Sequence, residues 1–250
     1  MNHALQTSKL VKRFGGFVAT SDVTLNVAAG ARHALIGPNG AGKTTLINLL
    51  TGFLEPSEGA VILKGEDVTH LAQHQRVKRG LARTFQINRL FADMTVLESV
   101  TLAVCERRGI GSRWWNPVGS HVEAIDEAAA LLQQLRLIDV AHQQTKSLAY
   151  GRQRLIEIAL ALAAKPTVLL LDEPAAGVPT SESRELFETI AQLPREVTIL
   201  LIEHDMDLVF RFADRISVLV GGALVAEDVP EVIAKDKRVK EVYLGEALDG

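Results

Sequence analysis

Gly37-Pro-Asn-Gly-Ala-Gly-Lys-Thr-Thr45 is the stretch that decides the fold of this chain. It fits the phosphate-binding pattern G-x-x-x-x-G-K-[ST], with Lys43 in the lysine position and Thr44 in the hydroxyl position. A strand-like run at residues 31–36 precedes the stretch, and a helical pattern at residues 46–50 follows it. An ordinary glycine-rich turn is the alternative interpretation, but strand, loop and helix in this order favour a nucleoside triphosphate site.

The chemistry of the loop explains its spacing. Glycines let successive backbone N–H groups turn toward a phosphate, and the following helix directs its positive end to the same place. Lys43 supplies a positive charge for the β- and γ-phosphates, and Thr44 supplies an oxygen for Mg²⁺. We expect the nucleotide to contact the whole loop: Gly37, Pro38, Asn39, Gly40, Ala41, Gly42, Lys43, Thr44 and Thr45.

Length, composition and charge exclude several classes of protein. The chain has 250 residues, of which 47% are hydrophobic and 23% are charged, as in ordinary soluble globular proteins. Its net charge of −3 lacks the basic surplus of nucleic-acid-binding proteins, so no nucleic-acid partner is expected. No apolar run approaches the ~18 residues that cross a bilayer, and the first residues show no signal-peptide pattern. The expected location is therefore the cytosol.

Cysteine and histidine usage indicates no disulfide and no metal cluster. The single cysteine, Cys105, excludes an intramolecular disulfide and is expected to be a small core residue. Five histidines show no metal-binding spacing and receive no role: His33, His70, His74, His121 and His142.

Apolar patterns predict an α/β fold with a parallel sheet. The near-continuous apolar runs at residues 168–171 and 197–202 are typical of parallel strands that are covered on both faces. A helical pattern at residues 181–193 lies between them and completes a strand–helix–strand unit. Alternation over residues 8–30, with a further strand at residues 60–63, predicts an antiparallel part near the N-terminus.

The chain is expected to form one domain with two appended parts. Helical spacing over residues 122–137 and 154–164 predicts an α-helical subdomain, which we place at residues 87–160. Residues 229–250 have helical composition and predict a small C-terminal extension. Residues 1–250 together are taken as a single nucleotide-binding domain.

Two carboxylates follow the first of the buried strands. Asp172 and Glu173 stand at its C-terminal end, which is the edge where ligands bind in open α/β sheets. We expect Asp172 to help hold Mg²⁺ and Glu173 to polarise the water that attacks the γ-phosphate. His204 follows the second buried strand and is placed to reach the γ-phosphate. A strand end with solvated acids is the alternative interpretation, and the phosphate-binding loop in the same chain disfavours it.

Taken together, these residues resemble the ATP-binding subunit of an ATP-binding cassette (ABC) transporter, over essentially the whole chain. The resemblance implies a P-loop NTPase core with ATP and Mg²⁺ as cofactors and ATP hydrolysis as the activity. Phe14 is similar to the aromatic residue on which the family stacks adenine; a core phenylalanine is the alternative. Gln86 matches the glutamine that touches Mg²⁺ and the attacking water, Glu173 matches the general base, and His204 matches the switch histidine.

A second nucleotide contact is implied by the stretch Leu148-Ala-Tyr-Gly-Arg-Gln153, which occupies the place of the family's signature, commonly L-S-G-G-Q. In the family, this loop of one subunit closes on the ATP held by another subunit. Ala149, Tyr150 and Gly151 are therefore expected contacts across a dimer, with a helix N-terminus from Gly151 onward facing the γ-phosphate. Ala149 lacks the signature hydroxyl, so this contact is expected to use the backbone alone.

The details of the signature narrow the resemblance. The Ala149–Gly151 variant and the loop at residues 174–177 are similar to the ATP-binding subunits of branched-chain amino acid importers, as are residues 202–207 and 243–246. That group implies a second ATP-binding subunit, identical or related, and integral-membrane permeases, with a periplasmic binding protein as an indirect partner. It also implies a peripheral location on the cytoplasmic face of the membrane. Residues 178–180 are Val-Pro-Thr, where Leu-Asn-Pro is expected. Pro179 stiffens the loop that crosses to the other subunit.

Several alternatives stay open on the sequence. The same scaffold serves transporters of urea, amides or lipopolysaccharide, because the cargo never touches the ATPase. A soluble ABC ATPase acting on ribosomes or DNA is a further alternative, although such proteins usually carry two cassettes or long insertions. Trp114 and Trp115 either anchor a partner or pack their loop onto the helical subdomain.

Overall fold

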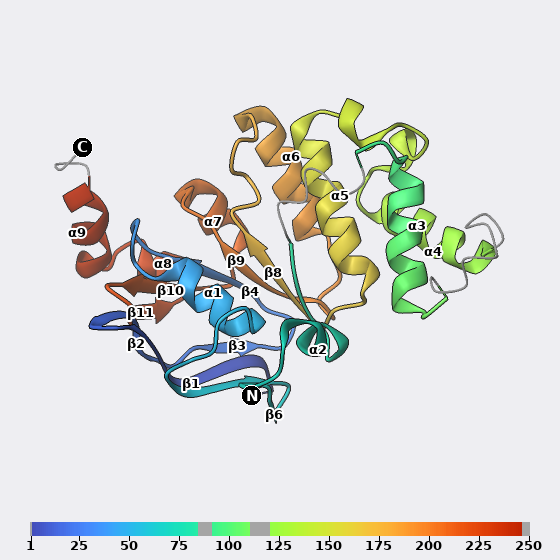
Figure 1. The fold of residues 1–250 in the computed structure, drawn as a ribbon. Helices are drawn as coiled ribbons and strands as arrows, with labels where there is room; N and C mark the ends of the chain where they lie inside the picture. The colour runs from blue at the N-terminus through green and yellow to red at the C-terminus, as the bar shows by residue number, and fades with distance from the viewer. Residues whose placement is uncertain (1, 85–91, 111–120, 247–250) are drawn as a thin grey trace. The chain divides into compact units, whose positions relative to one another are not determined.

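The computed structural model describes residues 2–84, 92–110 and 121–246, with side chains through residue 241 (Figure 1). The chain forms two compact units. The first consists of Met1–Arg83, Thr167–Glu173 and Arg195–Gly250, and we call it the sheet unit. The second consists of Thr84–Pro166 and Pro174–Pro194, and we call it the helical unit.

A six-stranded sheet forms the centre of the sheet unit. Its order is β11-β10-β4-β9-β8-β7; it is parallel from β10 to β7, and β11 pairs antiparallel at the edge. The strands are β4 (Arg32–Ile36), β7 (Leu81–Arg83), β8 (Val168–Asp172), β9 (Thr198–Ile202), β10 (Arg215–Val220) and β11 (Ala223–Asp228). Strands β8 and β9 confirm the two predicted parallel strands. The apolar patterns identified neither β10 nor β11.

An antiparallel sheet confirms the prediction for the N-terminal part. Its order is β2-β1-β5-β6, and β3 also pairs with β1. The strands are β1 (His3–Phe14), β2 (Phe17–Val23), β3 (Asn26–Ala28), β5 (Glu58–Leu63) and β6 (Glu66–Asp67). Helix α1 (Lys43–Thr51) shares one core cluster with both sheets, represented by Leu5 of β1, Leu46 of α1 and Leu200 of β9. The helix that follows the phosphate-binding loop is therefore anchored in the core.

A buried arginine holds the far end of α1. Arg76 of α2 (Gln73–Lys78) is 1% exposed and donates from Nη1 to the carbonyl oxygens of Leu49 and Leu50, at 2.7 and 2.6 Å. A cation at the C-terminus of a helix offsets the negative end of its dipole and donates to the carbonyls of the last turn, of which that of Leu49 also accepts from the Gly52 N–H. The sheet unit also contains α7 (Met206–Phe212), α8 (Pro230–Ile233) and α9 (Lys237–Glu246).

His33 of β4 belongs to a buried polar chain across three strands. Its side chain is 0% exposed, and its Nε2 lies 2.8 Å from Ser217 Oγ of β10. Ser217 in turn donates to Glu227 Oε2 of β11 at 2.9 Å, so its oxygen accepts from an Nε2–H of His33. Burial lowers the pKa of His33 to about 4, although the Glu227 charge opposes the shift. This histidine is therefore a neutral structural residue at neutral pH.

The lowered pKa of His33 predicts an acid-sensitive sheet unit. Between pH 6.5 and about 4 the unfolded chain binds a proton that the folded chain does not, so stability falls as the pH drops through this window. The expected loss is ~3 kcal/mol, at ~1.4 kcal/mol per pKa unit. Urea denaturation at several pH values measures it, and His33→Gln is expected to flatten the slope in this window. The control variant, His142→Gln, replaces an exposed histidine and is expected to keep the wild-type slope. Equal slopes for wild type and His33→Gln would refute the assignment.

In its described part the helical unit contains four α-helices. They are α3 (Val96–Arg107), α4 (Val122–Gln134), α5 (Tyr150–Ala163) and α6 (Thr180–Ala191). Two short 3-10 helices, Ile138–Val140 and Thr145–Ser147, lie between α4 and α5. The helical spacing at residues 122–137 and 154–164 is confirmed by α4 and α5. Cys105 of α3 is 2% exposed, as predicted for a small core residue.

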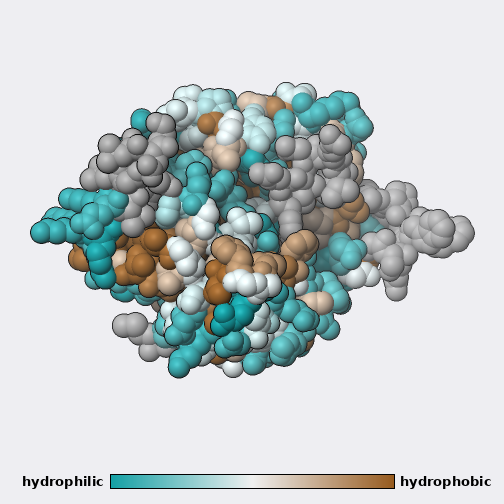
Figure 2. All heavy atoms as spheres, turned by 60° about the vertical axis from the view of Figure 1, so that its left-hand side comes forward, coloured by the Kyte–Doolittle hydropathy of each residue, from teal (hydrophilic) through white to brown (hydrophobic). Residues whose placement is uncertain are grey.

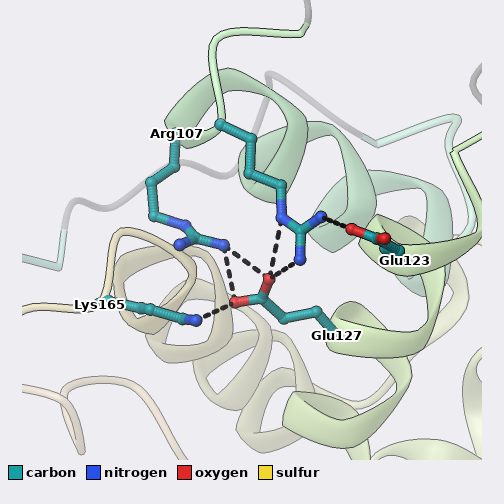
Figure 3. A network of polar contacts seen from close by, with 5 residues as sticks. Arg107, Glu123, Glu127 and Lys165 are labelled. Atoms are coloured by element: carbon teal, nitrogen blue, oxygen red, sulfur yellow. Dashed lines mark hydrogen bonds and ion pairs between the residues drawn. The ribbon is translucent and has the colours of Figure 1, made fainter.

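One carboxylate ties three segments of the helical unit together. Figure 3 shows Glu127 of α4 within reach of Arg107 of α3 and Lys165, which follows α5. Arg108 also pairs with Glu127, at 3.0 Å, and with Glu123, at 2.8 Å. Because Glu127 is mostly buried and contacts three cations, it holds the packing of α3 against α4 and the end of α5.

The face of the molecule seen in Figure 2 carries both hydrophobic and hydrophilic side chains. In Figure 2 hydrophobic side chains gather in patches among polar ones. Several large hydrophobic side chains of the sheet unit are exposed: Phe14, Phe17, Phe53, Val229 and Val232. Among the helices that the structure describes, none has both the length and the apolar character to cross a bilayer.

Candidate nucleotide-binding site

The predicted phosphate-binding loop connects β4 to α1 at the C-terminal end of a buried strand in the middle of the sheet. Two of its glycines are required by close backbone packing. A Cβ atom at Gly37 would lie 2.1 Å from the carbonyl oxygen of Leu219 in β10. One at Gly42, where φ is +101°, would lie 2.5 Å from the carbonyl oxygen of Ala19 in β2. The loop therefore has its conformation set by its neighbours before any ligand binds.

The start of α1 presents the donors that bind a phosphate. Gly42 is its N-cap, and no side chain of the described residues caps the helix there. The first N–H groups of the helix therefore suit an anion. Lys43 folds over the loop, with its Nζ donating to the carbonyl oxygens of Gly37 at 2.5 Å and Pro38 at 2.8 Å. A lysine ammonium and a helix N-terminus thus meet at one loop, and these residues fit a triphosphate.

Asp172, the last residue of β8, is held by a side chain from the neighbouring strand. Arg83 of β7 donates from Nη2 to Asp172 Oδ2 at 2.7 Å and from Nη1 to Asn48 Oδ1 of α1 at 2.8 Å. The Arg83 and Asp172 side chains are 16% and 23% exposed. A carboxylate and the Thr44 hydroxyl are hard oxygen donors, so the donor chemistry fits Mg²⁺.

Glu173 has an unusual backbone conformation. Its φ is +47°, in the left-handed region that side chains disfavour. Its N–H donates to the carbonyl oxygen of Ile202 at 2.9 Å, which ties the end of β8 to the end of β9. Such strain costs ~1–3 kcal/mol and is common at functional sites. The Glu173 carboxylate at this strained turn is 43% exposed, so it is accessible to a ligand.

His204 lies beside Glu173. The Nδ1 atom of His204 is 3.9 Å from Glu173 Oε1 and 3.8 Å from Oε2 of Glu203, which is 1% exposed. Residues predicted from separate stretches of sequence therefore meet at the C-terminal ends of adjacent strands. The His204 side chain is 65% exposed, which leaves it accessible to a bound nucleotide.

Phe14 lies at the end of β1 and is 48% exposed. Phe14 is therefore not a core residue, and the alternative interpretation of this position as a core phenylalanine is wrong. The Lys12 Nζ atom lies 5.2 Å from the centre of its ring. An exposed ring can stack on a nucleobase, and its adenine contact stays a prediction.

The signature stretch lies in the helical unit, at the start of α5. The helix begins at Tyr150 with Ala149 as its N-cap, one residue earlier than the expected start at Gly151. The Gly151 N–H donates to Oε2 of Glu182, in α6, at 2.9 Å. Since Ala149 has no hydroxyl to cap α5, Glu182 supplies the missing acceptor. A cavity of about 190 Å³ lies beside this cap.

Three residues at these sites were not found by sequence reasoning. They are Asn48, Arg83 and Glu182, and each acts through a partner that is distant in the chain. Arg83 and Asp172 are 89 positions apart, and Gly151 and Glu182 are 31 positions apart. No local pattern marks such pairs, because they depend on which elements pack together.

Some predicted residues lie outside the part of the chain that the structure describes. Gln86, Trp114 and Trp115 lie outside the described residues, as does most of the loop at residues 109–119. Their roles stay predictions.

Comparisons with known proteins identify the family of the chain. Residues 20–176 match the family model described as ABC transporter. The chain is 42% identical over 252 residues to "High-affinity branched-chain amino acid transport ATP-binding protein BraF" of Pseudomonas aeruginosa, covering 97% of this chain and 98% of the relative. It is also 42% identical over 250 residues to the protein of the same description named LivG in Escherichia coli (strain K12), with the same coverage.

Solved structures of the same fold cover nearly all of the chain. A nucleotide-free ATP-binding cassette from an ABC transporter has a TM-score of 0.85 and 31% identity, and covers 97% of this chain and 99% of its own. The ADP conformation of an ATP-binding cassette has a TM-score of 0.87 and 32% identity, and covers 98% of this chain and 100% of its own. The chain therefore belongs to the ABC transporter family and is one of its ATP-binding subunits.

Proposed function

We propose that this chain is the ATP-hydrolysing subunit that powers the import of branched-chain amino acids through separate membrane permeases. The observation that carries the proposal is the 42% identity to branched-chain amino acid transport ATP-binding proteins, which extends over 97% of the chain. Likeness over the full length, and not only over the nucleotide site, supports a shared partner surface as well as a shared reaction.

The sheet unit supplies the groups for hydrolysis. Lys43 and the N–H groups at the start of α1 bind the β- and γ-phosphates and stabilise the charge that spreads over the γ-phosphate oxygens. Glu173 orients and polarises the attacking water. His204, whose Nδ1 lies 3.9 Å from Glu173 Oε1, contacts the γ-phosphate. The water oxygen bonds to the γ-phosphorus, and the bond between the γ-phosphorus and the oxygen that bridges the β- and γ-phosphates breaks. The products are ADP and inorganic phosphate. The exposed ring of Phe14 stacks on adenine.

Thr44 and Asp172 would hold Mg²⁺, and the family resemblance of the sequence adds Gln86 as a further ligand. The ion supplies neutralising charge to the phosphate oxygens. Thr44 and Asp172 offer oxygen atoms at the start of α1 and at the end of β8. We infer that Mg²⁺ and ATP bind as one complex.

The chain acts with a second ATP-binding subunit. The Ala149–Gly151 loop at the start of α5 contacts the γ-phosphate held by that subunit through backbone N–H groups, and the N–H of Gly151 has to leave Glu182 Oε2 to take part. A "Dimeric Structure" of a bacterial ABC transporter cassette, 25% identical to this chain with a TM-score of 0.74, supports such an assembly. The permeases then hold the pair at the cytoplasmic face of the membrane, and a periplasmic binding protein delivers the amino acid to them.

Uptake measurements test the proposed cargo. Deleting the gene from the organism that carries it is expected to abolish high-affinity uptake of radiolabelled leucine, isoleucine and valine, and the wild-type gene restores uptake. The Glu173→Gln variant is expected to fail in this complementation because it binds ATP without hydrolysing it. Loss of urea or amide uptake with normal leucine uptake would identify a different cargo, and unchanged transport of all of them would favour a soluble ABC ATPase.

A further inference from the structure

The proposed function leaves Arg83 without a role, although its side chain makes two side-chain hydrogen bonds at the site. Its guanidinium joins three elements of the sheet unit: β7, which carries it, the end of β8 through Asp172, and α1 through Asn48. The two hydrogen bonds, at 2.8 and 2.7 Å, use different nitrogens of one planar group. A planar fork held at two points has little freedom to move.

The pairing register explains why the guanidinium reaches both partners. Strand β7 runs parallel to β8, with Arg83 opposite Leu170, so its side chain lies two positions short of Asp172 at the same edge of the sheet. Asn48 is in the helix that begins at Lys43. Arg83 therefore connects the carboxylate at the strand end to the helix that follows the phosphate-binding loop.

We propose that Arg83 is a positioning residue that holds one oxygen of Asp172 so that the other is fixed in orientation for Mg²⁺. Mg²⁺ requires nearly ideal octahedral geometry, so a ligand that swings freely binds it poorly. Groups that hydrogen-bond to metal ligands set their orientation, and their removal typically lowers metal affinity ~10- to 100-fold. The inference rests on the proposed role of Asp172 as a Mg²⁺ ligand.

A simple charge balance is the competing explanation. In that case the arginine only offsets the negative charge of a carboxylate that is 23% exposed, and its own positive charge competes with Mg²⁺. Removing Arg83 would then strengthen Mg²⁺ binding, and a lysine would replace it without loss. The two explanations predict opposite shifts, so one titration separates them.

The experiment measures the binding of a fluorescent ATP analogue to the full chain, first in EDTA and then with increasing Mg²⁺. The Mg²⁺ midpoint is the Mg²⁺ concentration at which binding of the analogue is half-maximally enhanced. Arg83→Gln and Arg83→Lys are both expected to raise this midpoint ~10- to 100-fold and to leave the affinity for the analogue in EDTA unchanged. Lysine fails because it cannot make both hydrogen bonds in the same geometry. Asp172→Asn gives the reference effect, and Mn²⁺ electron paramagnetic resonance of the bound nucleotide reports the metal directly.

Two further variants complete the test. Arg79→Gln removes an arginine of the same unit that pairs with Glu66, and it is expected to leave the Mg²⁺ midpoint unchanged. Asn48→Ala removes only the second anchor of Arg83, so it shifts the midpoint in the same direction even where an Arg83 variant does not fold.

The outcomes separate the proposal from the proposed function. An unchanged or lowered Mg²⁺ midpoint in the Arg83 variants, full rescue by lysine, or an unchanged midpoint in Asn48→Ala would overturn the positioning role alone. If ATP binding by the wild-type chain does not respond to Mg²⁺, the proposed role of Asp172 as a Mg²⁺ ligand is refuted. The positioning role of Arg83 is then refuted with it.

Discussion

Replacing Glu173 by glutamine is expected to lower the rate of ATP hydrolysis by a factor of ~10² to 10⁴ while ATP binding is retained. The amide keeps the size of the side chain, but it cannot polarise the attacking water as a carboxylate does. Steady-state phosphate release measures the rate, and equilibrium binding measures the affinity. With the second ATP-binding subunit present, the ATP-bound dimer is expected to persist in analytical ultracentrifugation, because the hydrolysis that releases it is blocked.

The local geometry makes this variant informative. Glu173 has φ of +47° and its N–H is bonded to Ile202, so the backbone that directs the side chain is retained when only the carboxylate changes. Glu188→Gln, at an exposed position of α6, is the matched control and is expected to hydrolyse ATP at the wild-type rate. Hydrolysis by Glu173→Gln at the wild-type rate would show that another group activates the water.

Replacing Lys43 by alanine is expected to weaken ATP binding about a hundredfold. A charge-assisted hydrogen bond of this kind contributes ~3 kcal/mol when it is lost from a bound anion, and 1.4 kcal/mol corresponds to a factor of ten. The Lys43 Nζ atom lies at the loop itself, hydrogen-bonded to the carbonyl oxygens of Gly37 and Pro38. Isothermal titration calorimetry with ATP measures the change.

Two variants control for charge and shape at this position. Lys78→Ala removes a lysine from an exposed position of α2 and is expected to leave ATP affinity unchanged. Lys43→Arg keeps the charge in a larger, planar group whose donors are arranged differently, so it is expected to restore binding only in part. ATP affinity of wild-type strength in Lys43→Ala would contradict the assignment of the loop.

Much of the fold was predictable because the decisive patterns are local. The strand, loop and helix around Lys43 are contiguous, and the apolar runs that became β8 and β9 are buried on both faces. Strands β10 and β11 were not predicted. Every residue of β11 is only partly buried, since this strand forms the edge of the sheet, so it lacks the continuous apolar run of a central strand.

The sequence by itself determined the chemistry of the site: a triphosphate loop, two carboxylates at a strand end and a histidine after the next strand. Only the tertiary structure decided how they are held. It placed Arg83 between Asp172 and Asn48, and it placed Glu182 where Ala149 cannot cap α5. The physical reason is the separation of the contacting residues along the chain. A phosphate loop is encoded by neighbouring residues and their backbone freedom, whereas these hydrogen bonds join positions between 31 and 89 residues apart, which meet only through sheet register and helix packing.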